Sequence, residues 1–82
     1  MATVLLRLFA AAREAAGCSS TEMEASTVGE VLDIARARFG AEFIAVLAGS
    51  RVWIDGDEPA LGDATVVTDG CEVAVLPPVS GG

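Results

Sequence analysis

The two most apolar runs of this sequence, residues 3–9 and residues 71–76, lie near opposite ends of the chain. In both runs the side chains alternate between two faces, as they do in a β-strand. Both faces of the first run are mostly apolar, so we expect that strand at the centre of a sheet. Pairing the two runs side by side there would bury the most apolar surface, so the fold is expected to bring the two ends of the chain together.

A strongly specified helix lies between these runs. Residues 27–30 form a capping box, in which the Thr27 hydroxyl accepts the Glu30 backbone N–H and the Glu30 carboxylate reaches back to the Thr27 N–H. Arg36 and Arg38 suit the negative end of the helix, and Gly40 supplies its stop. The apolar face of the predicted helix consists of Val28, Val31, Leu32, Ala35 and Phe39.

The segments around this helix have weaker patterns. Residues 10–16 are alanine-rich, which predicts a short helical turn that stops at Gly17. Residues 21–25 alternate acidic and non-acidic side chains, which is typical of an edge strand with one face in water. Residues 42–47 predict a brief second helix or turn.

Short strands and turns are expected in the last third of the chain. Residues 51–54 predict a strand that ends in a turn at residues 55–56, and residues 65–67 predict a minor strand. A tight turn at residues 69–70 leads into the last strand. These elements predict an α+β fold, a roll in which a mixed sheet packs on one main helix.

Length and composition bound this fold. An 82-residue chain with 52% hydrophobic residues has room and apolar material for one small domain, which we expect over residues 1–76, with residues 77–82 as a flexible tail. No apolar stretch approaches the roughly 20 residues of a membrane span, and residues 1–3 lack the basic start of a secretory signal. We therefore expect a cytoplasmic protein.

The net charge of −7 limits the partners. Twelve acidic residues face five arginines, and the sequence contains no lysine and no histidine. Nucleic acid and anionic membranes attract basic surfaces, so we expect neither as a partner. A basic protein surface is the partner that this charge favours, although acidity that simply aids solubility is an equal alternative.

The missing residue types also limit the chemistry. Without histidine or lysine there is no imidazole base and no Schiff-base amine. Cys18 and Cys71 lie far apart in the sequence and lack the partners of a metal site, so we expect two reduced thiols, no metal and no bound cofactor. A redox or sulfur-handling role for Cys18 is an alternative.

The last six residues have a distinctive sequence. Pro77 and Pro78 cannot donate to a sheet ladder, so regular structure is expected to end there. Glycines allow close backbone approach, so the closing Gly81-Gly82 could deliver a carboxylate through a narrow channel into the active site of another protein. A frayed end or a cloning remnant is the alternative.

Several separated segments together resemble a known family. They are Phe9-Ala10, the Arg-Glu-Ala-Ala-Gly sequence of residues 13–17, the capped helix, residues 69–70, residues 72–74 and the Pro-Pro-Val-Ser-Gly-Gly end. Along essentially its whole length the chain resembles the small, sulfur-carrier subunit of molybdopterin synthase, of the MoaD/ThiS family. This resemblance implies the ubiquitin-like β-grasp fold, which agrees with the predicted roll.

The resemblance also implies a chemistry. An E1-like partner would adenylate the Gly82 carboxyl group with ATP, and sulfur from a persulfide-bearing protein would replace AMP to leave a thiocarboxylate. The loaded tail would insert into the large catalytic subunit, where sulfur passes to cyclic pyranopterin monophosphate in molybdenum cofactor biosynthesis. The chain would then be no enzyme on its own, but the sulfur-donating subunit of a heterotetramer, a dimer of heterodimers.

Individual residues take roles from the same resemblance. Gly82 carries the sulfur and Gly81 keeps the approach narrow. Phe9 and Leu76 match apolar positions that the family uses against its partners, with plain core packing as the alternative. Arg13 is expected to form an ion pair at the interface with a partner, and a solvated surface arginine is the alternative. The remaining arm residues are Pro77, Pro78, Val79 and Ser80.

Other functions on this fold stay open at this point. They are sulfur carriage for thiamine, cysteine or tungsten-cofactor synthesis, a ubiquitin-like modifier that acylates lysines, and a binding module with an inert tail. The Pro-Pro-Val before Ser-Gly-Gly favours the molybdopterin branch. Residues 53–56, Trp-Ile-Asp-Gly, depart from the family pattern, in which an aliphatic residue and asparagine are frequent, and this bears on the local turn and on partner preference.

Overall fold

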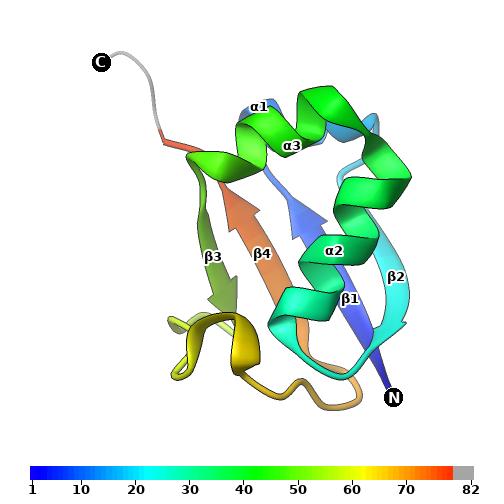
Figure 1. Ribbon diagram of the computed structural model, residues 1–82, viewed down its shortest axis with the longest axis vertical. Coiled ribbons are helices and arrows are strands. Elements are labelled where there is room, and N and C mark those ends of the chain that lie inside the picture. The colour runs from blue at the N-terminus through cyan, green and yellow to red at the C-terminus, as the bar shows by residue number, and fades with distance from the viewer. Residues whose placement is uncertain (79–82) are drawn as a thin grey trace.

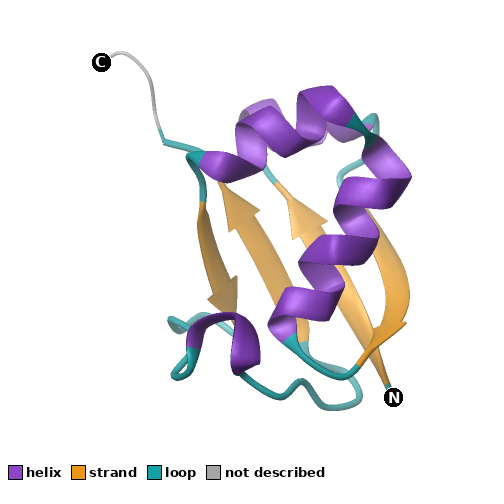
Figure 2. Ribbon diagram, viewed as in Figure 1, coloured by secondary structure: helices purple, strands orange, loops and turns teal. Residues whose placement is uncertain are grey.

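A four-stranded mixed sheet forms one layer of the protein, and helices pack on one of its faces (Figures 1 and 2). The structure, a computed structural model, describes residues 1–78. The elements in chain order are β1 (Ala2–Leu8), α1 (Ala10–Ala16), β2 (Ser20–Ala25), α2 (Val28–Phe39), α3 (Ala41–Ala48), β3 (Arg51–Ile54), a 3-10 helix (Gly62–Ala64) and β4 (Glu72–Leu76).

The strand order confirms that the two ends of the chain meet at the centre of the sheet. The order is β2-β1-β4-β3, so β1 and β4 are the inner strands. They pair in parallel, with Leu6 opposite Val73, whereas β2 and β3 pair antiparallel to their neighbours. Figure 1 shows the arrows of β1 and β4 pointing the same way and that of β3 pointing the opposite way. Residues 21–25 are an edge strand, as predicted.

The core lies between the sheet and the helices. Alternate residues of β1 are buried, and they meet the apolar face of α2 that the sequence predicts. Phe43 of α3 is fully buried, and its ring centroid lies 5.1 Å from that of Phe39. Within residues 1–78 no polar or charged residue is buried. The brief helix or turn expected at residues 42–47 is the helix α3, which adds Phe43 to the core beside the longer α2.

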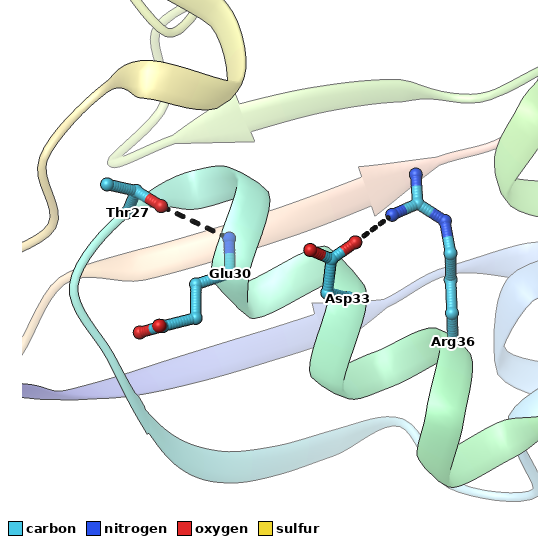
Figure 3. Close-up of polar contacts among 4 residues, drawn as sticks. All are labelled: Thr27, Glu30, Asp33 and Arg36. Carbon is cyan, nitrogen blue, oxygen red and sulfur yellow. Dashed lines mark hydrogen bonds and ion pairs between the residues drawn. The ribbon is translucent and has the colours of Figure 1, made fainter.

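The start of α2 follows the capping box with one change (Figure 3). Thr27 Oγ1 accepts the Glu30 backbone N–H at 3.2 Å, as predicted. The Glu30 carboxylate, however, accepts the N–H of Ser26 at 2.6 Å and not that of Thr27. A bridge between Thr27 and Val66 keeps this segment extended, and the Ser26 N–H is the one that reaches the carboxylate. Further along the helix Arg36 pairs with Asp33 at 2.7 Å.

The expected minor strand at residues 65–67 is wrong. Only the isolated bridge of Val66 to Thr27 forms there, flanked by bonds from the Val28 N–H to the Thr65 carbonyl and from the Val67 N–H to the Ser26 carbonyl. The ladder does not continue, because the chain opposite this segment enters α2 at Val28, directly after Thr27. The preceding residues instead form the 3-10 helix Gly62–Ala64.

No helix among the described residues is both long enough and apolar enough to cross a membrane.

Candidate functional site

The face of the sheet away from the helices carries a groove of about 360 Å³. Its lining residues are Phe9, Trp53, Gly56, Glu72, Ala74 and Leu76. The β3–β4 register places Trp53 opposite Ala74, and both strands alternate, so these side chains share the face that the core does not use. The groove is therefore a product of three segments, the end of β1, β3 and β4.

Phe9 forms one wall of this groove. Its N–H donates to the Val75 carbonyl at 3.3 Å, which holds the end of β1 beside β4. The next residue, Ala10, has a left-handed backbone (φ 49°), and the Phe9 carbonyl accepts the Ala12 N–H at 3.0 Å, so the chain turns directly from strand into α1. Phe9 is 38% exposed, so it lies outside the core.

Arg7 packs against this wall from the same face of β1. Its guanidinium lies 5.6 Å from the centroid of the Phe9 ring, within the range of a cation–π contact. Its Nη1 lies 3.6 Å from a carboxylate oxygen of Glu72, which also lines the groove. A basic and an acidic side chain thus flank an otherwise apolar hollow.

Asp55 holds the turn below the groove. Its backbone is left-handed (φ 49°), its carboxylate accepts the Glu72 N–H at 2.8 Å, and its own N–H donates to the Glu72 carbonyl at 2.8 Å. These bonds extend the β3–β4 pairing past the end of β3. Asp55, which the sequence indicates only as a turn residue, therefore positions Glu72 and Gly56 of the groove.

Leu76 and the two prolines place the exit of the chain at the groove. Phe9 and Leu76, both expected at a partner surface, line the same hollow, and the strand β4 ends at Leu76. Pro77, half-buried, and Pro78, exposed, follow directly. The roles predicted for Val79, Ser80, Gly81 and Gly82 fall on residues outside those that the structure describes.

Arg13 does not join this site. It lies exposed on α1, does not line the groove, and makes no ion pair within residues 1–78. The sequence, conversely, gave no site role to Arg7, Glu72 or Ala74. Alternation in β1 and β4 was the available signal, since it places each of them on the same face as Phe9 or Leu76.

The two cysteines are free, and neither of them lines the groove. Cys71 is 3% exposed, and burial raises the pKa of its thiol above the ordinary value of 9.0, with the negative charge of Asp55 acting in the same direction. Cys18 is half-buried against the core. In the described part of the chain no group of three or more His, Cys, Asp or Glu residues could hold a metal ion.

Comparison with known proteins finds a matching family and similar solved structures. The ThiS family model matches residues 6–82. Small archaeal modifier protein 1 (SAMP1) from Methanosarcina acetivorans is 29% identical over 100% of this chain and 98% of its own, with a TM-score of 0.88. SAMP1 from Haloferax volcanii is 31% identical over 98% of this chain and 99% of its own, with a TM-score of 0.79.

A more distant likeness concerns the fold alone. One chain in the protein–protein complex of subunits 1 and 2 of the molybdopterin-converting factor from Helicobacter pylori 26695 is 21% identical, over 98% of this chain and 99% of its own, with a TM-score of 0.75. Comparison with the curated proteins gave no match. The mixed sheet, its parallel inner pair and the helices on one face are the ubiquitin-like β-grasp fold. With a family model that spans residues 6–82, the chain belongs to the ThiS family.

Proposed function

We propose that this protein is the sulfur carrier of a molybdopterin synthase, in which the Gly82 carboxyl group becomes a thiocarboxylate and donates its sulfur to cyclic pyranopterin monophosphate. The observation that carries the proposal is the place where the chain leaves the sheet. Leu76 lines the groove and is also the last residue of β4. Gly82 lies six residues further on, so a fully extended tail reaches at most about 20 Å from Leu76 into a partner docked on the groove.

The groove has the character of a protein-docking surface. Its floor and walls are mostly apolar, with one tryptophan and one phenylalanine, and aromatic residues are enriched in the buried centres of protein interfaces. A partner docked here would cover Phe9, Trp53 and Leu76 and would hold the start of the tail. Docking thus brings the terminal carboxyl group into the active site of the partner without any reacting group on this domain.

The chemistry requires activation by other proteins. A carboxylate is a poor acyl donor, so an E1-like enzyme transfers AMP from ATP to Gly82 and releases pyrophosphate. A persulfide on a donor protein then displaces AMP, and a thiol cleaves the sulfur–sulfur bond, which leaves the thiocarboxylate on Gly82 and a disulfide on the donor. Transfer of that sulfur to the pterin, with water supplying oxygen, returns the carboxylate.

The proposed partners follow from these steps. They are the E1-like enzyme, the persulfide donor, and a large catalytic subunit, with which the chain forms a heterotetramer. ATP is consumed in the E1-like enzyme, and no cofactor is assigned to this chain. The subunit 1–subunit 2 complex of Helicobacter pylori supports such a pairing for a protein of this fold.

Intact-mass spectrometry tests the proposal directly. The chain is incubated with ATP, an E1-like enzyme and a persulfide source, and we expect the mass gain of one oxygen replaced by sulfur at the C-terminus. The loaded chain with the large subunit should then convert cyclic pyranopterin monophosphate to molybdopterin. A variant that lacks Gly82 is the control, and unchanged pterin conversion by this variant would overturn the proposal.

A ubiquitin-like modifier is the second candidate. Its support is the likeness to two proteins that are named small archaeal modifier proteins, at 29% and 31% identity over nearly the whole chain. In this case the activated Gly82 acylates lysine amines of target proteins. Adducts of higher mass that survive denaturant and thiol support this function, whereas a sulfur-loaded C-terminus without adducts supports sulfur carriage. A loaded chain that fails with the pterin indicates a carrier for thiamine, cysteine or tungsten-cofactor synthesis.

A further inference from the structure

Arg7 occupies a position between two residues of the groove. On the open face of the sheet its guanidinium lies 5.6 Å from the Phe9 ring centroid and 3.6 Å from a Glu72 oxygen. The parallel register explains the second contact, because Leu5 lies opposite Glu72 and Arg7 opposite Ala74. Arg7 and Glu72 are therefore diagonal neighbours on one face, a distance that long side chains cross easily.

We propose that Arg7 is a positioning residue, which holds the Phe9 ring as a fixed wall of the groove so that the groove is already formed before a partner docks. This inference rests on the proposed function, because it assigns the groove as the docking surface for the large catalytic subunit. Arg7 acts through Phe9 and does not itself bind the partner. The groove accordingly receives an apolar side chain of the partner between Phe9 and Trp53.

The surroundings of Phe9 show why such a support is needed. The ring is 38% exposed, and its residue is the junction of β1 and α1, with no further strand residue after it. A partly exposed ring at the end of a strand is free to change rotamer, and that freedom must be lost when a partner packs against it. The guanidinium over its face favours one position, and Glu72 in turn restrains the guanidinium.

The same contacts contribute little to the stability of the fold. The Arg7 and Glu72 side chains are 47% and 43% exposed, and exposed ion pairs have small effects on unfolding. The arrangement therefore acts on binding more than on folding, since a pre-organised side chain lowers the entropic cost of association. This difference separates a positioning role from a structural one.

A double-mutant cycle tests the proposal with the large subunit of molybdopterin synthase as the probe. Arg7→Gln removes the charge and keeps a long polar side chain, and it is measured in the wild-type and in the Phe9→Ala background. We expect Arg7→Gln to weaken binding about two- to fivefold in the first background and to have no further effect in the second. Arg36→Gln, which removes an equal charge and an ion pair on α2, is the matched control and should bind like the wild type.

Two results of this cycle would overturn the proposal. If Arg7→Gln weakens binding by the same factor in both backgrounds, Arg7 contacts the partner directly. If it has no effect while Phe9→Ala weakens binding, the ring needs no support. If Phe9→Ala itself leaves binding unchanged, or no complex forms, it is the proposed docking function that fails.

A measurement on the free protein decides the role of Arg7 in that last case. Three-bond couplings in NMR spectra report the χ1 angle of Phe9. We expect one rotamer in the wild type and averaged couplings in Arg7→Gln, with an unchanged unfolding midpoint. Equal averaging in both proteins would overturn the positioning role, whatever the partner proves to be.

Discussion

The carboxylate of Asp69 accepts the backbone N–H of Thr3 at 2.8 Å, across 66 positions of the sequence. The next residue, Gly70, donates its N–H to the Thr3 carbonyl at 3.0 Å, so both backbone groups of Thr3 are bonded to one turn. The Leu5 N–H then bonds to the Cys71 carbonyl at 3.0 Å. The turn at residues 69–70 therefore aligns β4 with β1 at the point where their parallel pairing begins.

Removal of the Asp69 carboxylate should weaken this alignment. We expect Asp69→Ala to lower the free energy of unfolding by about 1 kcal/mol, since it leaves the Thr3 N–H to water alone. Urea denaturation followed by circular dichroism measures the change. Asp57→Ala is the control, because it removes an equal charge from a side chain without a hydrogen bond in the described part of the chain. Equal losses in the two variants would contradict the prediction.

Gly29 of α2 lies against Asp63 of the 3-10 helix. A Cβ atom at this position would lie 3.0 Å from Asp63 Cβ and 3.1 Å from the Asp63 carbonyl oxygen. We expect Gly29→Ala to lower the free energy of unfolding by about 1 kcal/mol, because the overpacking outweighs the better helix propensity of alanine.

Gly49→Ala is the matched control for this substitution. Gly49 has φ −103°, and nothing within 4 Å would meet its Cβ atom. The stability of the Gly49→Ala protein should be unchanged or slightly higher than that of the wild type. The measurement is the thermal unfolding midpoint of both variants. A Gly29→Ala protein as stable as Gly49→Ala would show that Asp63 moves away from the added Cβ atom without loss of stability.

The stability of the protein should fall at alkaline pH because of Cys71. Burial raises the pKa of its thiol in the folded state, so the unfolded chain loses this proton first as the pH rises. The contribution is fully present below 9.0 and is lost as the pH rises from 9.0 through the folded-state pKa. With no lysine and no tyrosine in the sequence, few other groups titrate between about pH 8 and 11.

Denaturation at a series of pH values checks this effect. Cys71→Ala should lose the downward slope above pH 9.0, although it is less stable at neutral pH because a buried side chain is truncated. If the slopes of wild type and Cys71→Ala coincide, the burial of this thiol has no effect on alkaline unfolding.

Phe9 and Phe43 should lose very different amounts of stability on the same substitution. Phe43 is fully buried, so Phe43→Ala is expected to cost about 3–5 kcal/mol of unfolding free energy. Phe9→Ala should cost less than about 1 kcal/mol, since the ring lies outside the core. Its effect should fall instead on binding to the large subunit, measured by calorimetry. If Phe9→Ala loses as much stability as Phe43→Ala, the Phe9 ring contributes to the core and the prediction is wrong.

Trp53 provides a direct signal of docking. It is the single tryptophan of the sequence, and it lines the groove. Contact with a partner should exclude water from the indole and shift its emission to shorter wavelength, measured with a tryptophan-free variant of the large subunit. Arg36→Gln should show the same shift as the wild type, as its side chain lies on α2. An unchanged spectrum at saturation would place the partner elsewhere on the protein.

Local patterns alone were sufficient for most elements of the fold. Alternation of side chains defined β1 and β4, and the capping box of Thr27 and Glu30 with the stop at Gly40 defined α2. The local interactions that produce these signals lie within a few residues, so they are visible in sequence. The apolar character of both faces of β1 also indicated its central place in the sheet.

The groove required tertiary structure. The strand expected at residues 65–67 does not form, because propensity does not show how far a partner segment stays extended, and here that segment enters α2 directly after Thr27. Phe9, Trp53 and Leu76 come from three segments, and only the parallel β1–β4 pairing and the antiparallel β3–β4 register bring them together. The sequence by itself determined most of the elements, because these depend on local interactions, and its separated motifs indicated the family. The contact of Arg7 with Glu72 across the two inner strands was decided by strand register, which depends on contacts between residues far apart in the chain.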